Sequence, residues 1–427
     1  MRRIALISEH ASPLAAAGGV DSGGQNVYVA HVARQLGLRG YSVDVYTRKD
    51  RPLLPTVQHW QPNVRVIHVP AGPERFVAKE ELLPWMGDFG DFIHRRCRQS
   101  ARAYDAVHAN FFMSGVAARS LTRQLGLPLI MTFHALGLVR RQHQAERDRF
   151  PDERFAIEAE LVREASRVIA ECPQDVDDLC SLYAADPLKL DTVPCGFDPN
   201  EFAPIARGEA RRILQWHPQR FTILQLGRMV PRKGVDNVIE ALALLRDRGV
   251  DAELVIVGGN SDKPSADATP ELGRLDALAR TLGVQDRVRF IGRRNREQLR
   301  YFYSAADVFV STPWYEPFGI TPVEAMACAT PVIGSAVGGI RSTVRDGVSG
   351  YLVPPRKAAA LADGLAELAA NPALREAMGQ AGRELAYRHY TCARVTSQIA
   401  AVYERAIQSQ PPRNRTSLDL EATGASS

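Results

Sequence analysis

Short apolar runs alternate with helical patterns along almost the whole chain, and they do so in two successive sets. Runs that are continuously apolar, rather than alternating, predict strands of parallel sheets covered on both faces. The first set comprises 3–8, 42–47, 64–69, 106–109, 129–133, 168–171 and 192–194, and the second comprises 222–226, 252–257, 288–291, 308–311, 332–334 and 351–353. Strand–helix–strand units need right-handed crossovers, so each set predicts one doubly wound α/β domain.

Length and punctuation also favour two domains. The chain has 427 residues, whereas single cores seldom grow beyond about 250–300 residues. Gly and Pro interrupt the pattern at 194–199, so we expect an N-terminal domain at 1–197 and a C-terminal domain at 198–390. A helical pattern at 391–408 has no following strand and must dock elsewhere. The tail at 409–427 carries too little apolar surface to order itself, and we expect it to be disordered.

Composition excludes several classes of protein. Hydrophobic and charged contents of 45% and 24% are those of a soluble globular protein, and no run is long enough to cross a bilayer. Six scattered cysteines without a CxxC pair argue against a disulfide framework or a zinc site and suit the cytoplasm. A net charge of +5 suits anionic small molecules or peripheral contact with an anionic membrane, and does not demand nucleic acid.

Two carboxylates flank a turn that follows a predicted strand. Glu316 begins the sequence Glu316-Pro317-Phe318-Gly319, and Glu324 lies eight residues after Glu316. Open α/β sheets place ligands at the carboxyl ends of their strands, and two acids there can accept hydrogen bonds from sugar hydroxyls. The alternative for Glu324 is a capping box with Thr321, with Pro322 at the first helical position. Glu316 has no capping role, so we interpret it as functional.

A glycine-rich loop precedes the first predicted helix. Its glycines do not have the GxGxxG spacing, and Arg48 and Lys49 stand where a dinucleotide site needs an acid. These departures argue against a nicotinamide dehydrogenase. Gly23-Gly24 can still expose unsatisfied N–H groups at a helix N-terminus to phosphate oxygens. A tight turn without a ligand is the alternative.

Cations and a histidine also follow predicted strands. Arg228 and Lys233 share the loop after the first strand of the second set, where together they can neutralise a departing diphosphate. A surface salt bridge is the alternative. His134 ends the strand at 129–133 and faces the expected crevice, or is structural. Asp175-Val176-Asp177 matches a metal-binding DxD, but it stands at a helix start, so we interpret it as capping and expect no metal site.

These features together resemble family 4 of the retaining glycosyltransferases, which have the two-domain GT-B fold. The resemblance runs from Arg3 to about Ala406 and lies in the order of the motifs just described. It implies that the 391–408 helix crosses back to the first domain. It also implies a nucleotide-diphosphate-sugar donor and no cofactor or metal. The donor residues that it implies are Gly23, Gly24, Arg228, Lys233, Arg293, Glu316, Phe318, Gly319, Ile320 and Glu324. In these roles Glu324 holds the ribose, Arg293 lies beside the base, and Glu316 and His134 contact the transferred sugar.

Within that family the chain is similar to the inositol-phosphate N-acetylglucosaminyltransferases of mycothiol synthesis and to sucrose-phosphate synthases. Acceptor-phosphate contacts of the first group map onto Lys79 and Arg154, which match, but a tyrosine and a threonine map onto Phe111 and Ala135. We also place Gln25 and Asn26 in the acceptor site. The catalytic residues that we expect are His134, Glu316, Arg228 and Lys233.

The resemblance thus implies a retaining hexosyltransferase whose donor is a nucleotide-diphosphate sugar, UDP-glucose or UDP-N-acetylglucosamine. The acceptor that we expect is a hydroxyl of a small polyol or sugar, and whether this acceptor is phosphorylated stays open. Fructose 6-phosphate, or a lipid or polysaccharide, stays open as acceptor, and a homodimer stays open as assembly. Two rival functions are a phosphorylase of the same fold and a non-catalytic nucleotide-sugar-binding protein. A phosphorylase would need a pyridoxal phosphate lysine, which no stretch suggests. Degenerate binders should lose the carboxylates or cations, and here all are present.

Overall fold

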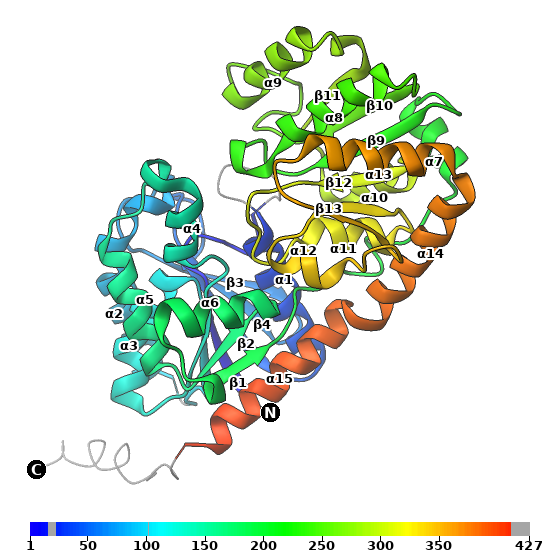
Figure 1. The fold of residues 1–427 in the computed structure, drawn as a ribbon. Helices are drawn as coiled ribbons and strands as arrows, with labels where there is room; N and C mark the ends of the chain where they lie inside the picture. Colours follow the sequence, from blue (N-terminus) through cyan, green and yellow to red (C-terminus); the bar gives the residue numbers. More distant parts are fainter. Residues whose placement is uncertain (16–22, 101, 411–427) are drawn as a thin grey trace, which may run out of the picture.

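Two parallel-sheet α/β domains face one another in a computed structural model that describes residues 1–15, 23–100 and 102–410 (Figure 1). The first sheet has the strand order β3-β4-β2-β1-β5-β6-β7-β8. Its strands are β1 (Arg3–Ile7), β2 (Ser42–Arg48), β3 (Val57–Gln61), β4 (Val64–Val69), β5 (Ala106–Asn110), β6 (Leu129–Thr132), β7 (Arg167–Ala170) and β8 (Leu190–Thr192). The predicted doubly wound α/β architecture is confirmed, because the order runs outward from β1 in both directions.

Alternate residues of β1 face two different cores. Ile4 and Leu6 pack with α1 (Gly24–Leu38) and the C-terminal helix, whereas Ala5 and Ile7 pack with helices on the other face. Those other helices include α2 (Met86–Arg98), α3 (Phe112–Leu125) and α5 (Glu153–Glu164), and α4 (Gly137–Gln144) and α6 (Pro173–Tyr183) complete the domain. Burial on both faces is why these strands are continuously apolar.

The edge strand β3 is the part of the sheet that the apolar pattern did not predict. It pairs antiparallel with β4, and its sequence, Val57-Gln58-His59-Trp60-Gln61, is mostly polar and partly exposed. An edge strand covered on one face has no need of a continuous apolar run, so it left no signal of the kind that marked the others. The last predicted strand of this sheet, at 192–194, is also displaced and lies at Leu190–Thr192.

The second sheet has six parallel strands in the order β11-β10-β9-β12-β13-β14. They are β9 (Phe221–Leu226), β10 (Ala252–Val257), β11 (Val288–Gly292), β12 (Val308–Ser311), β13 (Val332–Ser335) and β14 (Gly350–Val353). Its helices are α7 (Arg207–Leu214), α8 (Val235–Asp247), α9 (Pro270–Thr281), α10 (Arg296–Ala305), α11 (Ile320–Ala327), α12 (Gly338–Thr343), α13 (Ala358–Ala370) and α14 (Pro372–His389). The strand order changes direction between β9 and β12, so the loops after these strands border the site.

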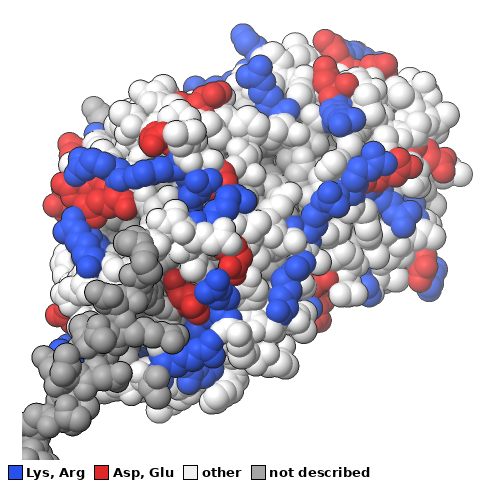
Figure 2. Space-filling model, turned by 90° about the horizontal axis from the view of Figure 1, so that it is seen from below, with Lys and Arg blue, Asp and Glu red and all other residues white. Residues whose placement is uncertain are grey.

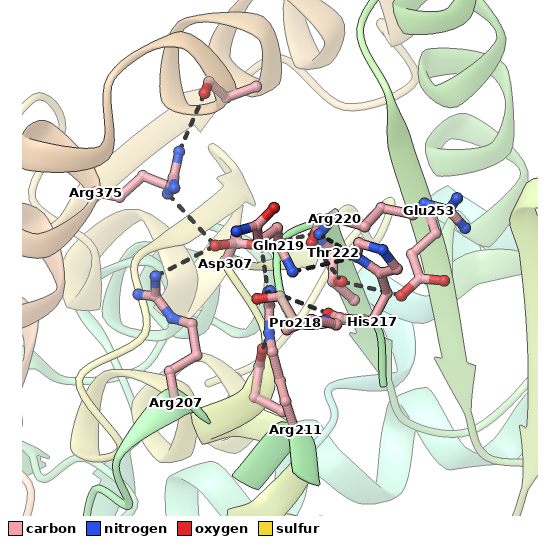
Figure 3. Close-up of polar contacts among 12 residues, drawn as sticks. Arg207, Arg211, His217, Pro218, Gln219, Arg220, Thr222, Glu253, Asp307 and Arg375 are labelled. Atoms are coloured by element: carbon pink, nitrogen blue, oxygen red, sulfur yellow. Dashed lines mark hydrogen bonds and ion pairs between the residues drawn. The ribbon is translucent and has the colours of Figure 1, made fainter. Parts of the chain in front are cut away.

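A buried acid ties helices to the amino-terminal ends of the two central strands of this sheet, and Figure 3 shows its contacts. The Asp307 carboxylate accepts hydrogen bonds from the Thr222 backbone N–H at 2.8 Å and from Arg211 Nη2 at 2.6 Å. Arg207 and Arg375 lie 3.3 and 3.6 Å from its other oxygen. Asp307 therefore joins α7 and α14 to β9 and β12.

The chain passes between the domains twice, and the two passages lie side by side. Phe197 forms an isolated parallel bridge with Thr391, with backbone hydrogen bonds of 2.8 Å to Tyr390 and Cys392. The second passage leads into α15 (Cys392–Gln408), which runs back along the first domain and packs on α1 (Figure 1). The predicted return of the C-terminal helix is confirmed. The predicted disordered tail falls, from residue 411 onward, outside the described residues.

Basic side chains do not form one continuous field on the face shown in Figure 2, where separate blue groups alternate with acidic and uncharged surface. Within the described ranges, no helix combines the length and apolar character that a membrane span requires.

Candidate functional site

The loops at the carboxyl ends of the two sheets enclose one cavity of about 540 Å³. Every site residue predicted from the sequence lines it. From the first domain these are Gly23, Gly24, Gln25, Asn26, Lys79, Phe111, His134 and Arg154, and from the second Arg228, Lys233, Arg293, Glu316, Phe318, Gly319, Ile320 and Glu324. The structure thus brings the predicted residues together, and the role of each stays a prediction.

The N-terminus of α1 opens into this cavity. Gly23 is its N-cap, and Asn26 accepts a hydrogen bond from the Gly23 N–H at 3.0 Å while its amide donates to the Ser12 carbonyl at 3.0 Å. Asn26 therefore supports the loop, although we predicted an acceptor contact. A Cβ atom at Gly24 would lie 3.3 Å from Ile320, so the first turn of α1 approaches the second domain closely. The predicted glycine loop before residue 23 lies outside the described residues.

Lys233 and Glu316 form a partly buried ion pair at the centre of the second domain's contribution. Lys233 ends the short 3-10 turn Pro231–Lys233 after β9, and Arg232 Nη1 lies 3.8 Å from the same carboxylate. Burial works against ionisation of Glu316, but Lys233 and Arg232 outweigh it and hold the pKa of that carboxyl below its usual value. Burial, only partly offset by Glu316, lowers the pKa of Lys233. A cation and an anion thus meet where both can contact one ligand.

Backbone packing fixes the loop that carries Glu316. Gly338 has φ +46°, and a Cβ atom there would lie 1.8 Å from the Glu316 carbonyl oxygen. The Gly339 N–H donates to that same carbonyl at 3.2 Å. The glycine pair after β13 therefore exists so that two backbones can approach closely. Sequence reasoning missed this support, for which the adjacent glycines Gly338-Gly339 were the available signal.

The capping-box alternative for Glu324 is wrong. Helix α11 begins at Ile320 with Gly319 as its N-cap, so Thr321 lies inside the first turn and caps nothing. Glu324 is 2% exposed and accepts a hydrogen bond from Tyr303 Oη at 2.9 Å. Its other oxygen lies 2.9 Å from Arg296 Nη1. Gly319 starts the helix because its φ of +90° suits a residue without a side chain.

His134 is held between two polar side chains on neighbouring strand ends. Its Nδ1 lies 2.8 Å from Glu171 Oε1 and its Nε2 lies 3.0 Å from Asn110 Oδ1. The residue adopts a left-handed φ of +58°, which its surroundings must enforce. Both ring nitrogens therefore already face oxygen atoms, and the imidazole would have to release Asn110 before it could contact a sugar hydroxyl through Nε2.

Glu171 collects hydrogen bonds that orient the histidine. It accepts from His134 and from the Cys195 thiol at 3.0 Å, and these contacts lower the pKa of Glu171 despite its burial. Asn110, Glu171 and Cys195 were not predicted. Asn110 is the last residue of β5, and Glu171 directly follows β7. The rule that selected His134, a polar side chain at the end of a buried strand, was therefore sufficient to find both.

Arg154 lies in an aromatic cage at the first domain's side of the cavity. It is fully buried, with its guanidinium 5.0, 4.9 and 4.6 Å from the ring centres of Phe111, Phe112 and Phe150. Its Nε donates to Glu158 at 2.7 Å, while its Nη1 has no hydrogen-bond partner in the described part of the chain. A buried donor without a partner faces a free-energy cost that an anionic ligand would relieve.

The remaining acceptor candidates surround that cage. Gln25 donates to the Asn110 carbonyl at 3.1 Å, and Lys79 lies on a short turn at Lys79–Glu81. Arg140, which sequence reasoning missed, lines the cavity, stacks on Phe150 and pairs with Asp148 at 2.7 Å. Three cations, Lys79, Arg140 and Arg154, therefore border the first domain's part of the cavity.

Side chains of the two domains also meet across the cavity. The His143 ring stacks on Tyr315 at 4.9 Å between ring centres, and the Gln144 amide donates to Tyr315 Oη. The guanidinium of Arg232 also lies over the Tyr315 ring, 5.1 Å from its centre. Sequence reasoning could not predict this pairing, because Gln144 and Tyr315 are 171 residues apart in the chain.

The DxD sequence lies beside the cavity and does not open into it. Asp175 stands in the first turn of α6 and accepts a hydrogen bond from the Glu171 N–H at 2.9 Å. Burial, together with the nearby Glu171, raises the pKa of Asp175 well above its usual value. Neither Asp175 nor Asp177 lines the cavity.

Comparison with known proteins decides the family. A model described as glycosyltransferase family 4 matches residues 22–201, and one described as glycosyl transferases group 1 matches residues 206–385. A D-inositol 3-phosphate glycosyltransferase of Actinosynnema mirum is 38% identical over 412 residues, which are 95% of this chain and 98% of that protein. The chain is a family 4 glycosyltransferase. It is an enzyme of the hexosyltransferase type, as the resemblance predicted.

Other relatives of this family 4 glycosyltransferase agree. A protein of the same name from Geodermatophilus obscurus is 37% identical and covers 95% of the chain. Among solved structures, sucrose-phosphate synthase from Thermosynechococcus elongatus matches with a TM-score of 0.88 and 32% identity, covering 96% of this chain and all of that one. Anabaena HepE, solved with UDP and glucose, shares the fold at 20% identity and a TM-score of 0.73. The GT-B fold is confirmed, and both predicted branches occur among the relatives.

Proposed function

We propose that this glycosyltransferase moves glucose or N-acetylglucosamine, with retention, from the corresponding UDP-sugar to a hydroxyl of a small phosphorylated polyol or sugar. The observation that carries the proposal is the convergence of the α1 N-terminus, Lys233 and Glu316 on one cavity. Unpaired N–H groups at a helix start and a lysine suit a diphosphate, while a carboxylate suits sugar hydroxyls.

In the proposed reaction the departing diphosphate takes the proton of the incoming hydroxyl on the same face of the sugar. Arg228, Lys233 and the Gly24 N–H stabilise the charge that develops on the leaving group. Glu316 and the backbone of Phe318 and Gly319 orient the sugar. His134, oriented by Glu171, releases Asn110 and lies beside the sugar, where it accepts a hydrogen bond from a sugar hydroxyl or stabilises the oxocarbenium-like transition state. No metal or other cofactor takes part in this proposal, since the diphosphate charge has protein partners.

The acceptor side supports an anionic group. Arg154 Nη1 has no hydrogen-bond partner among the described residues, and Lys79 and Arg140 line the same cavity. Similar proteins are named for inositol 3-phosphate and for sucrose phosphate, which carry a phosphate on a polyol or sugar. The apolar wall of Phe111 and Phe150 would equally suit a lipid-linked acceptor, and this is the second candidate.

We place the enzyme in the cytoplasm, where nucleotide sugars are available. Peripheral membrane contact and a homodimer are further proposals. A non-catalytic role is disfavoured because the cations and carboxylates of the donor site are all present.

The test is a transfer screen of UDP-glucose and UDP-N-acetylglucosamine against inositol phosphate, fructose 6-phosphate and lipid acceptors. We expect transfer to a phosphorylated acceptor and none to its dephosphorylated counterpart. Transfer to lipid acceptors alone would favour the second candidate, and nucleotide-sugar binding without transfer to any acceptor would favour a sensor.

A further inference from the structure

A partly buried chain of charges connects the interdomain linker with the carboxylate expected to hold the ribose. Glu201, in the linker between the sheets, pairs with Arg296 Nε at 2.5 Å. Arg296 opens α10 and lies 2.9 Å from Glu324 through Nη1, with its guanidinium 4.8 Å from the centre of the Phe202 ring. One arginine is thus shared by two carboxylates from different elements.

The same linker is attached to α1 of the first domain. His31 Nε2 lies 3.8 Å from Glu201, and Arg34 pairs with Asp198 at 3.0 Å. His31 Nδ1 also lies 2.9 Å from the thiol of Cys392, where α15 begins. The helix whose N-terminus opens into the cavity is therefore tied, through Glu201 and Arg296, to Glu324.

Two polar atoms in this chain of charges lack a well-aligned hydrogen bond. Arg296 Nη2 and Glu324 Oε1 are buried and have no hydrogen-bond partner with good geometry among residues 1–15, 23–100 and 102–410. Both side chains line the cavity. A buried donor and a buried acceptor that lack partners are costly, and native proteins retain such groups where a ligand satisfies them.

We propose that Arg296 is a second residue, beside Glu324, that binds the vicinal diol of the nucleotide ribose, and that Glu201 is the positioning residue that holds Arg296. This inference rests on the proposed function. Each hydroxyl of a diol can donate one hydrogen bond and accept another. Glu324 Oε1, whose contact with Arg296 Nη1 is an ion pair without hydrogen-bond geometry, can accept from such a hydroxyl, and Arg296 Nη2 can donate to it. A site that binds hydroxyls in this way rejects a ligand that lacks them.

The charge of Glu201 matters for this arrangement. Burial opposes ionisation, but the nearby His31 and the charge of Arg296 lower the pKa of Glu201 to about 2. Glu201 is therefore anionic at neutral pH and competes with Glu324 for the guanidinium. Without Glu201, the Arg296 guanidinium would pair with Glu324 alone. Neither the guanidinium nor the Glu324 carboxylate would then be oriented towards a ligand.

The test measures nucleotide binding to the full chain by calorimetry. The ligands are UDP and 2′,3′-dideoxy-UDP, and the matching pair of adenosine diphosphates. The proteins are the wild type, Glu201→Gln, Arg296→Gln and Arg34→Gln. Arg34→Gln is the matched control, because Arg34 pairs with the same linker from the same helix but does not contact Arg296. The wild type should prefer the ribose form by about tenfold or more, as for loss of charge-assisted hydrogen bonds. Glu201→Gln and Arg296→Gln should lose most of this preference and leave dideoxynucleotide binding unchanged, whereas the control should keep it.

A preference retained in both variants would overturn the inference and leave the proposed function standing. If the wild type bound neither nucleotide, the proposed function would fail and the inference with it. General damage to the fold is distinguishable, because it would weaken both members of each nucleotide pair and leave their ratio unchanged.

Discussion

Backbone contacts help to fix the loop that carries Glu316, and Gly338 is the residue on which those contacts depend. Gly338→Ala would place a Cβ atom 1.8 Å from the Glu316 carbonyl at a backbone φ of +46°, so the loop must move. Because small misplacements at a reacting centre are costly, we expect turnover to fall on the order of 10²-fold. Steady-state assays would measure this, with Gly208→Ala as control, since Gly208 is an exposed helical glycine with nothing within 4 Å. Unchanged turnover in Gly338→Ala would contradict the role of this contact.

Lys79 tests whether the acceptor is anionic. If Lys79 holds an acceptor phosphate, Lys79→Ala removes a charge-assisted hydrogen bond of about 1.5–3 kcal/mol and should raise the acceptor KM by roughly ten- to hundredfold. Acceptor-independent hydrolysis of the donor should not change. Lys189→Ala, which alters a first-domain lysine outside the cavity, serves as control. Equal transfer to acceptors with and without phosphate, in both wild type and Lys79→Ala, would refute the phosphate acceptor and leave the donor site untouched.

At the scale of single elements, α15 is fastened to the first sheet by a buried histidine. His108 Nδ1 lies 2.7 Å from Tyr403 Oη of α15, and Nε2 lies 2.8 Å from Thr132 Oγ1 of β6. Burial, with a smaller effect of His134, lowers the pKa of His108 from 6.5 to about 3. The folded protein therefore holds this histidine neutral at a pH where the unfolded chain protonates it.

The pH dependence of stability follows from that difference. Above pH 6.5 His108 is neutral in both states, and between 6.5 and about 3 only the unfolded state gains the proton, so stability falls as the pH falls. For one proton the slope approaches about 1.4 kcal/mol per pH unit. Denaturant unfolding between pH 7 and 5 should show this slope in the wild type, a reduced slope in His108→Gln, and no change from wild type in His59→Gln, an exposed histidine of β3. Identical slopes in wild type and His108→Gln would disprove it.

Elements differ in how much of them the sequence could predict. Strands such as β4, β10 and β12 matched their predicted limits, because burial on both faces leaves an unbroken apolar run. β3 could not be found in this way, since it is a polar edge strand. The start of α11 was misjudged, because a Thr–Glu spacing fits a capping box whether or not a glycine two residues earlier begins the helix.

The sequence predicted the residues that line the candidate site better than the contacts that hold those residues in place. His134 was found by a general rule for α/β sheets, which places ligand-binding residues at the carboxyl ends of strands. The same rule could have identified Asn110 and Glu171. The contacts of Arg296 with Glu201 and of Tyr315 with His143 depend on how two domains face each other. No local pattern contains that information, so only the structure could supply it.

At the scale of the whole molecule, the cavity between the domains has protein cations where other enzymes need a metal. Lys233 and the α1 N-terminus line this cavity, where we propose that they bind the diphosphate, and the Asp175 carboxylate accepts a hydrogen bond from the Glu171 N–H. We therefore expect transfer activity to survive excess EDTA. Assays before and after chelation would measure this. Loss of activity that Mg²⁺ or Mn²⁺ restores would return Asp175 and Asp177 to consideration as ligands.

The measurement that tests the account most directly is acceptor-dependent release of UDP from UDP-glucose and UDP-N-acetylglucosamine, in the wild type and in Lys233→Ala. Removing one preorganised donor to the leaving group should lower turnover by roughly 10²–10³-fold at saturating donor. Lys263→Ala, at an exposed lysine of the same domain outside the cavity, should match the wild type. Near-normal turnover in Lys233→Ala would contradict the assignment of the diphosphate to this site.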